Sequence, residues 1–199
     1  MRQKGAHRRS SDESRRRILA AASVVFAERG YERTSVREVA RRAGISVGGI
    51  YLYFRNKEDL YTGLMRSQMD EFLGRVGELR SKPPLGALRG LIDLYLEIAV
   101  TKTRMLSTSV KEYDLEFKRP VREAFFASQQ KIVAEILHQG IGSGVFRKID
   151  CGAVALVILV TLRGAILGYL TGDVRNTKQY ADHLYELFLK GIRSNRHAS

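Results

Sequence analysis

Residues 35–54, SVREVARRAGISVGGIYLYF, form the stretch that decides the fold. Ser35 and Glu38 have the spacing of a capping box, which predicts a helix from Val36 to about Ala43. Gly44 follows, and glycine ends helices because it adopts the left-handed backbone conformation without steric cost. The buried stripe of the predicted helix consists of apolar residues at helical spacing: Val36, Val39, Ala40 and Ala43. The stretch therefore begins like the first half of a helix-turn-helix.

A second short helix follows, with Ser46 as its expected cap. Ile50 and Phe54 are four residues apart and are predicted to face inward. The outer and lateral faces then carry Val47, Gly49, Tyr51, Leu52 and Tyr53. Exposed tyrosine and leucine side chains indicate a partner surface. Each of the two glycines costs about 1 kcal/mol of helix propensity, so close backbone approach to a phosphate backbone or groove floor is expected. The alternative is a helical hairpin with poorly chosen surface residues.

The charge of the chain is unevenly distributed. The 199 residues carry a formal net charge of +13, and the isoelectric point is about 10.1. Residues 1–66 hold 15 Lys and Arg against 7 Asp and Glu, whereas the remainder holds 19 against 14. A polyanion partner at the N-terminal end explains this asymmetry. A protein that is merely soluble and basic does not.

The block GYERTSVREVARRAGISVGGIYLYFRNKEDLYTGL, residues 30–64, resembles the DNA-binding domain of TetR-family transcriptional regulators. The matching features begin with Phe26-x-x-x-Gly-Tyr and Thr-Ser, then continue with Ala-Gly-Ile-Ser, Tyr-x-Tyr-Phe and Lys-Glu-x-Leu. They lie between about Ile18 and Leu64, a quarter of the chain; the rest is similar only in helical layout and length. The resemblance implies an all-α protein. An N-terminal three-helix helix-turn-helix domain would be joined by a long fourth helix to a helical ligand-binding and dimerisation domain.

Three regions are expected along the chain. Residues 1–11 are predicted to be a disordered basic arm, either contacting DNA or merely solvated. The DNA-binding domain is placed at 12–56, with a first helix over Asp12–Arg29 that Gly30 ends. The ligand-binding and dimerisation domain is placed at 57–199. Helices are predicted there at 57–79, 85–102, 105–117, 120–139, 151–170 and 177–193, with Asn56 and Asp150 as caps.

The last two predicted helices indicate a homodimer. Residues 151–170 are apolar nearly all round, a pattern of helices buried on all sides. Residues 177–193 carry one stripe: Tyr180, Leu184, Leu187, Phe188 and Ile192. The resemblance implies a four-helix bundle between two copies, and a two-fold dimer suits a palindromic double-stranded DNA operator with half-sites ~34 Å apart or multiples of this. The alternative is a core within one chain.

The resemblance also implies roles for residues of the helix-turn-helix. Phosphate-positioning roles are expected for Thr34, Tyr51, Tyr53 and Lys57, and groove-floor roles for Val47, Gly49 and Leu52. The remaining expected DNA contacts are Ser35, Arg37, Arg42 and Ser46. Since the second helix has no Arg, Asn or Gln, readout is expected from apolar contacts, from the arginines or from DNA shape. Lys57 is unfavourable at a positive helix end unless it holds a phosphate there.

A small-molecule effector is expected in the second half of the chain. Aromatic and sulfur side chains at helical spacing form either core or a ligand pocket there, and the resemblance favours the pocket: Tyr95, Met105, Tyr113, Phe117, Phe125 and Phe126. Arg163 interrupts an apolar helix and needs a partner. It is expected either to anchor an anionic ligand group or to pair with an acid across the dimer. Ligand binding would tilt the fourth helix and release the DNA.

Other functional classes are disfavoured. No catalytic residues, metal-ligand spacing or cofactor motif is present, so no enzyme, metal site or cofactor is expected. A single cysteine, Cys151, indicates a reducing compartment. The N-terminus lacks a signal peptide, and the apolar run Ala153–Leu162 is too short for a bilayer, so a cytoplasmic protein without membrane association is predicted. The expected function is a sequence-specific transcriptional regulator, a repressor released by a ligand. A ligand-independent architectural DNA-binding protein is the alternative.

Overall fold

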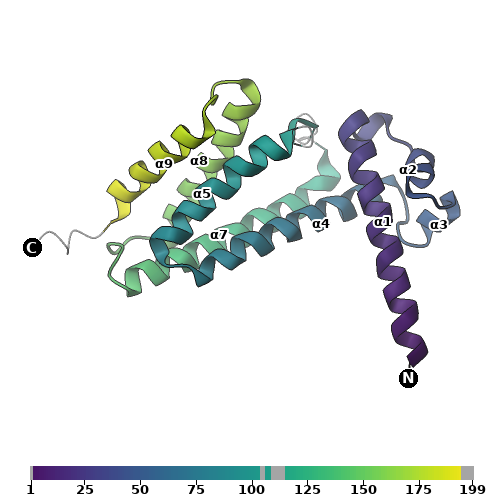
Figure 1. Cartoon of the computed structure of the whole chain (residues 1–199), viewed down its shortest axis with the longest axis horizontal. Coiled ribbons are helices and arrows are strands. Elements are labelled where there is room, and N and C mark those ends of the chain that lie inside the picture. Colours follow the sequence, from purple (N-terminus) through teal and green to yellow (C-terminus); the bar gives the residue numbers. More distant parts are fainter. Residues whose placement is uncertain (1, 104–105, 109–114, 194–199) are drawn as a thin grey trace, which may run out of the picture. The chain divides into compact units, whose positions relative to one another are not determined.

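The computed structural model describes residues 2–103, 106–108 and 115–193, with the backbone alone for residues 2–10 (Figure 1). Every regular element in these ranges is helical, which confirms the all-α prediction; one isolated bridge joins Phe146 and Arg193. Short 3-10 turns occupy Leu79–Ser81 and Glu116–Lys118. The α-helices are α1 (Arg2–Arg33), α2 (Val36–Ala43), α3 (Val47–Tyr51), α4 (Lys57–Glu78), α5 (Pro84–Thr101), α7 (Arg119–Gly142), α8 (Cys151–Thr171) and α9 (Thr177–Ile192).

The chain forms two compact units. Unit 1 comprises residues 1–69 and 107–121, and unit 2 comprises 70–106 and 122–199. The division differs from the predicted boundary at residues 56 and 57, because α4 begins in unit 1. Leu60, Tyr61 and Leu64 of α4 are buried in the core of unit 1, so the first half of α4 belongs to this unit.

Unit 1 is built on α1. Its predicted stripe is buried, as expected: Ile18, Ala22, Val25 and Phe26. The helix begins at Arg2, however, which corrects the expectation of a disordered arm over residues 1–11. The physical reason is composition, since this segment has no proline and is rich in residues of high helix propensity. Gly30 breaks the helical geometry with φ 74°, and the chain makes one further turn to Arg33.

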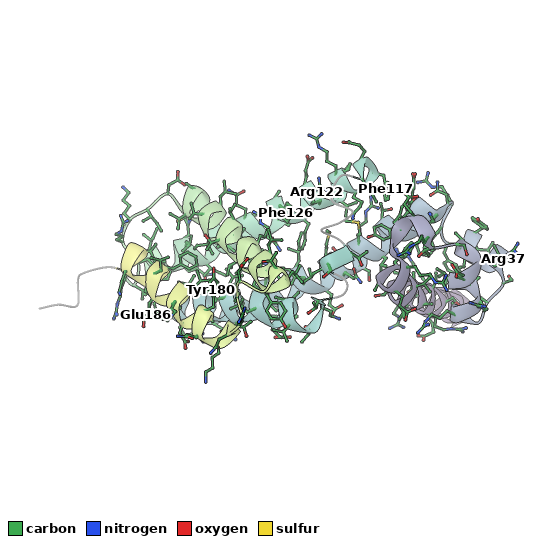
Figure 2. The ribbon with its side chains drawn as sticks, turned by 90° about the horizontal axis from the view of Figure 1, so that it is seen from above. Arg37, Phe117, Arg122, Phe126, Tyr180 and Glu186 are labelled. Atoms are coloured by element: carbon green, nitrogen blue, oxygen red, sulfur yellow. The ribbon has the colours of Figure 1, made fainter. Side chains whose placement is uncertain are left out.

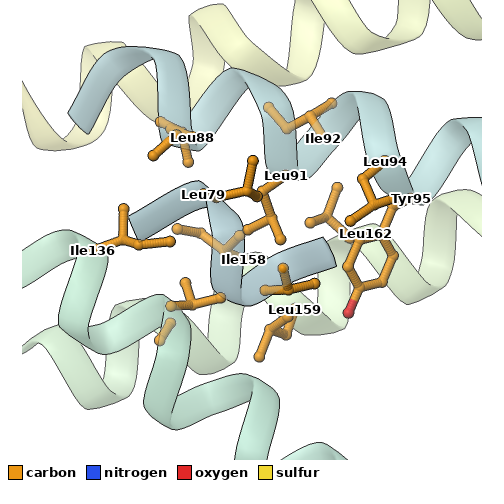
Figure 3. Packing of buried hydrophobic residues seen from close by; sticks show 14 of the residues in the cluster. Leu79, Leu88, Leu91, Ile92, Leu94, Tyr95, Ile136, Ile158, Leu159 and Leu162 are labelled. Carbon is orange, nitrogen blue, oxygen red and sulfur yellow. The ribbon is translucent and has the colours of Figure 1, made fainter. Parts of the chain in front are cut away.

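Unit 2 is organised around α5, which packs against α8 and α9. Aliphatic side chains from these helices, the end of α4 and α7 interlock in its core (Figure 3). The most enclosed of them are Leu88, Leu91, Ile92, Leu137, Ile158, Leu159 and Leu162. Caps fix the helix starts as predicted, since Asp150 accepts a hydrogen bond from the backbone of Ala153, 3.0 Å away. The helix signals in the sequence therefore predicted the bounds of these helices to within a few residues.

The surface of α8 differs from its prediction. The helix buries one face in unit 2, but the opposite face is exposed, so it is not enclosed on all sides within one chain. The exposed large apolar residues of α8 and α9 are Leu156, Val157, Val160, Leu167 and Leu187. By length and composition alone, the 21 residues of α8 are sufficient to cross a membrane, although the apolar run considered in the sequence was shorter. The exposed apolar face is therefore not covered by the described part of the same chain.

Candidate functional site

The helix-turn-helix starts with a complete capping box. The backbone N–H of Glu38 donates to Ser35 Oγ at 3.3 Å, and the backbone N–H of Ser35 donates to Glu38 Oε2 at 3.1 Å. The bond from the Ser35 backbone lowers the pKa of Glu38, and the nearby Arg29 guanidinium, 2.9 Å from Oε1, acts in the same direction. Both predicted partners therefore fix the first turn of α2.

A tight turn sets the direction of α3. Gly44 has φ 66° and ψ 37°, the left-handed conformation that the sequence predicted for this position. Ser46 then caps α3 by accepting a hydrogen bond from the Gly49 backbone at 3.0 Å. Ile50 and Phe54 are buried as predicted, so α3 keeps a fixed register against unit 1.

Two arginines of α1 contact residues of the helix-turn-helix, a role that the sequence analysis did not find. Arg17 Nη2 donates to the carbonyl oxygen of Ala43 at 2.9 Å, where α2 ends. Arg15 lies over the Phe54 ring, 5.5 Å from its centroid. The only sequence signal was a run of three arginines just before Ile18, part of the N-terminal charge that the sequence analysis attributed to a polyanion partner. Part of the basic charge of α1 therefore positions the helix-turn-helix.

The outer side of α2 and α3 presents most of the predicted DNA contacts. Tyr51 and Leu52 are 51% and 83% exposed. Burial of these side chains therefore contributes little to the folding of an isolated chain. Arg37 projects from the surface of unit 1 (Figure 2). Of the remaining predicted contacts on these elements, Ser35, Arg42 and Ser46 are exposed, and Val47, Gly49 and Tyr53 are partly exposed. Polar, cationic and apolar groups thus share one short segment of surface.

Thr34 is not available on this surface. Its side chain is 3% exposed, and its hydroxyl donates to the carbonyl oxygen of Gly30 at 2.7 Å. The hydroxyl satisfies a carbonyl at the end of α1, where the backbone leaves the helical path. The expectation that Thr34 positions a phosphate is therefore corrected, because its polar atom is enclosed and used.

Lys57 has partners that the sequence did not reveal. Its ammonium group donates to the carbonyl oxygens of Tyr31 at 3.0 Å and Glu32 at 3.3 Å, and lies 4.3 Å from the centroid of the Tyr31 ring. A cation at the start of α4 is thus placed at the negative end of α1. One of its three donors is left, so a phosphate contact by Lys57 stays a prediction.

Several of the predicted effector residues lie together in unit 2. Tyr95 is buried and its hydroxyl donates to Gln129 Oε1 at 2.9 Å. Phe125 lies 5.7 Å from Phe126, centroid to centroid, and the guanidinium carbon of Arg163 lies 4.2 Å from the Phe126 centroid. Gln129 was not predicted. Met105 and Tyr113 lie outside the described residues.

Phe117 belongs elsewhere. Its ring packs in unit 1, 4.9 Å from the Tyr31 centroid and 6.1 Å from the Tyr61 centroid. The expectation that Phe117 lines the effector site is therefore corrected. Helical spacing could not reveal this, because the segment around Phe117 returns to the core of the first unit.

The titratable groups of the described residues bear on metal binding and on thiol chemistry. Among the described residues, no three His, Cys, Asp or Glu side chains are grouped so that they could hold a metal ion. Burial raises the pKa of the Cys151 thiol, which disfavours the reactive thiolate. The chemistry that the surface of unit 1 offers is recognition, through cations, hydroxyls and exposed apolar groups.

The fold and this surface define a helix-turn-helix DNA-binding protein. Residues 18–64 match the family model described as bacterial regulatory proteins, tetR family. The fatty acid metabolism regulator protein of Bacillus subtilis is 27% identical over 184 residues, 89% of this chain and 94% of the relative. The transcriptional repressor KstR2 of Mycobacterium tuberculosis is 29% identical over 185 residues, 88% and 90% of the two chains.

A solved structure supports the same assignment. The regulator FadR of Bacillus subtilis, crystallised with stearoyl-CoA, has a TM-score of 0.74 and 27% identity, covering 89% of this chain and 98% of that one. Residues 18–64 therefore form a TetR-family DNA-binding domain, and the chain as a whole is similar to TetR-family transcriptional regulators.

Proposed function

We propose that the protein is a cytoplasmic transcriptional repressor that binds a palindromic operator as a homodimer and leaves it when a small molecule binds unit 2. The observation that carries this proposal is the exposed surface of α3, held in a fixed register by the capping box and the Gly44 turn. Exposed apolar and aromatic groups on a short, rigid helix suit the floor and walls of a major groove.

The DNA contacts divide into two kinds. Tyr51, Tyr53 and Lys57 position the helix on phosphates, assisted by Ser35, Ser46, Arg37 and Arg42. Val47, Gly49 and Leu52 approach base edges, where apolar contact with thymine methyl groups is the readout available to them. Hydrogen-bonded base readout by α3 stays weak, so the arginines and DNA shape contribute to specificity.

The exposed face of α8 supports the homodimer. Leu156, Val157, Val160 and Leu167 fall within about 100° of the helical wheel, at 3.6 residues per turn. Gly164 lies within the same arc, and a Cβ atom added there would meet nothing within 4 Å. A second copy of α8 can therefore approach closely at Gly164 and cover the valines and leucines. Leu187 of α9, 63% exposed, extends the apolar surface to the other predicted interface helix.

The effector assignment rests on unit 2 and on the relatives. The Bacillus FadR structure contains stearoyl-CoA, a ligand with a long apolar chain and anionic groups. Unit 2 of this protein has an aromatic cluster beside a cation, which suits a ligand of that general kind. Ligand binding would favour an arrangement of α4 in which the two α3 helices no longer match the half-sites. A hundredfold loss of DNA affinity requires about 2.7 kcal/mol of coupling.

The test is binding of the purified protein to the intergenic DNA upstream of its own gene, compared with shuffled DNA of the same composition at the same salt concentration. We expect a preference of ~10³ or more for the upstream fragment, the lower range for specific regulators. Equal and steeply salt-dependent affinity for both fragments would instead indicate a ligand-independent architectural protein.

A further inference from the structure

A group of polar side chains lies at the apolar core of unit 2, where Tyr95 and Gln129 are buried and Arg163 is partly buried. Tyr95 of α5, Gln129 of α7 and Arg163 of α8 lie near one another there, on three different helices. Figure 3 shows the Tyr95 hydroxyl at the edge of the packed aliphatic side chains. Burial raises the pKa of Tyr95, and the positive charge of Arg163 opposes this shift, so the guanidinium acts directly on the phenol. These helices therefore bring a cation and two neutral polar groups together.

Gln129 has hydrogen-bond donors left over. Its side chain is 2% exposed, and its oxygen accepts the Tyr95 hydroxyl proton. Its amide nitrogen carries two N–H groups, neither of which is hydrogen-bonded within the described part of the chain. In those same ranges, no fully enclosed side-chain nitrogen or oxygen lacks a partner, so the Gln129 nitrogen borders open space. Buried amides seldom leave donors unused, which indicates an acceptor from outside the chain.

Arg163 is held in position but is not neutralised. Its Nε donates to the carbonyl oxygen of Leu159 at 3.1 Å, and its guanidinium carbon stacks on Phe126 at 4.2 Å from the ring centroid. Within residues 11–103, 106–108 and 115–193, no carboxylate forms an ion pair with it. The four Nη hydrogens stay in a fixed plane, a fork that matches carboxylate and phosphate oxygens.

Aromatic side chains border this polar group. Phe72 of α4 lies 5.2 Å from Tyr95 and 5.8 Å from Phe125, centroid to centroid, and Phe125 continues to Phe126. Phe125 and Phe126 are both partly exposed, so part of each side chain remains accessible outside the core. A molecule that places an anion on Arg163 thus meets apolar rings with its remaining part.

We propose that Arg163 and Gln129 bind the anionic group, a carboxylate or a phosphate, of an amphipathic effector whose apolar part lies against Phe125 and Phe126. The inference rests on the effector binding proposed above and adds its selectivity for charge. A neutral molecule of equal chain length leaves the Arg163 fork and the Gln129 donors unmatched and binds more weakly.

The test measures binding to the full-length protein by calorimetry in the absence of DNA. The probes are dodecanoate, dodecanoyl-CoA and the neutral dodecanol. The variants are Arg163→Gln and the nearly isosteric Gln129→Glu, which replaces the donating amide with a carboxylate that would repel the ligand's anion. Arg80→Gln is the matched control, because Arg80 is an exposed arginine of unit 2 that pairs with Glu135 at 2.9 Å.

The wild-type protein should bind at least one anionic probe more tightly than dodecanol. Both variants should lower that affinity about 10- to 100-fold, as for a lost charged hydrogen-bonded pair, and leave dodecanol binding unchanged. Arg80→Gln should change neither. Binding of dodecanoate identifies the carboxylate as the recognised group; binding of dodecanoyl-CoA alone identifies the phosphates.

The proposal is overturned if neither anionic probe binds, if dodecanol binds as tightly as both, or if the variants keep wild-type affinity and selectivity. Should Arg163→Gln fail to fold, Gln129→Glu decides the question. Since no DNA is present, these results are independent of operator binding. Anion-selective binding without operator recognition would refute the repressor and retain this site.

Discussion

At the scale of single residues, close packing fixes the end of the helix-turn-helix. Gly63 of α4 faces the buried ring of Phe54, and a Cβ atom added at Gly63 would lie 2.8 Å from Phe54 Cε1. Gly74, in the same helix, would meet nothing within 4 Å. Packing against Phe54 therefore requires a glycine at position 63, whereas packing does not require one at position 74.

Alanine substitutions should separate these glycines. Gly63→Ala should lower the free energy of unfolding by about 1–3 kcal/mol, because the buried Phe54 ring must move. Gly74→Ala should raise it by up to about 1 kcal/mol through helix propensity. Urea denaturation followed by circular dichroism measures both. A gain in stability for Gly63→Ala would show that the Phe54 ring is not tightly held.

Tyr95 gives a prediction for the pH dependence of stability. Burial raises its pKa well above the ordinary value of 10. Above about pH 10, Tyr95 loses its phenolic proton in the unfolded chain but keeps it in the folded chain. The free energy of unfolding therefore falls as the pH rises past about 10. We expect Tyr95→Phe to weaken this alkaline decline.

Absorbance of the phenolate provides the measurement. In the folded protein, Tyr95→Phe should leave the change in absorbance between about pH 9 and 11 unaltered, because Tyr95 does not ionise there. A smaller change in the variant would mean that Tyr95 titrates like an exposed tyrosine, contrary to its enclosure beside Gln129.

The residues whose surroundings sequence reasoning did not reveal share one physical feature. Thr34, Lys57 and Phe117 each have a side chain whose partners come from another part of the chain. Local spacing predicts which face of a helix a residue occupies, but not which distant carbonyl or ring it meets. Arg163 and Tyr95 could be singled out because a cation in an apolar helix and an aromatic stripe are local signals.

At the scale of elements, local signals and tertiary packing differ in what they determine. The bounds of α2 matched the prediction, because the capping box of Ser35 and the Gly44 turn are encoded within ten residues. The start of α1 and the burial of α8 did not match. The start of α1 depends on helix propensity, because no capping residue marks it. The burial of α8 depends on how many neighbouring elements cover this apolar helix.

The exposed face of α3 leads to two contrasting substitutions. Tyr51→Phe should lower affinity about 2- to 10-fold for every DNA sequence alike, since it removes the hydroxyl that we propose to bond to phosphate. Leu52→Ala should change the preferred bases, because Leu52 is 83% exposed and is the side chain that we propose to approach the groove floor. Selection of binding sites from a random DNA library distinguishes the two. Altered base preference in Tyr51→Phe would contradict its assigned role.

At the scale of the whole molecule, the apolar face of α8 predicts assembly. Val160→Glu should convert the dimer into a monomer, since each dimer would bury two unpaired carboxylates. Val100→Glu is the matched control, because Val100 of α5 is similarly exposed, 46% against 56% for Val160. Light scattering should give twice the 22.5 kDa chain mass for the control and the single mass for Val160→Glu. A dimeric Val160→Glu protein would place the interface elsewhere.

The most direct test of ligand-controlled repression is the operator affinity of the intact protein, measured by fluorescence anisotropy with and without saturating dodecanoyl-CoA. We expect saturation to weaken operator binding about 100-fold, equivalent to about 2.7 kcal/mol of coupling between the two units. Arg163→Gln should need proportionally more ligand for the same release. Unchanged operator affinity, with calorimetry showing the ligand bound, would contradict the switch.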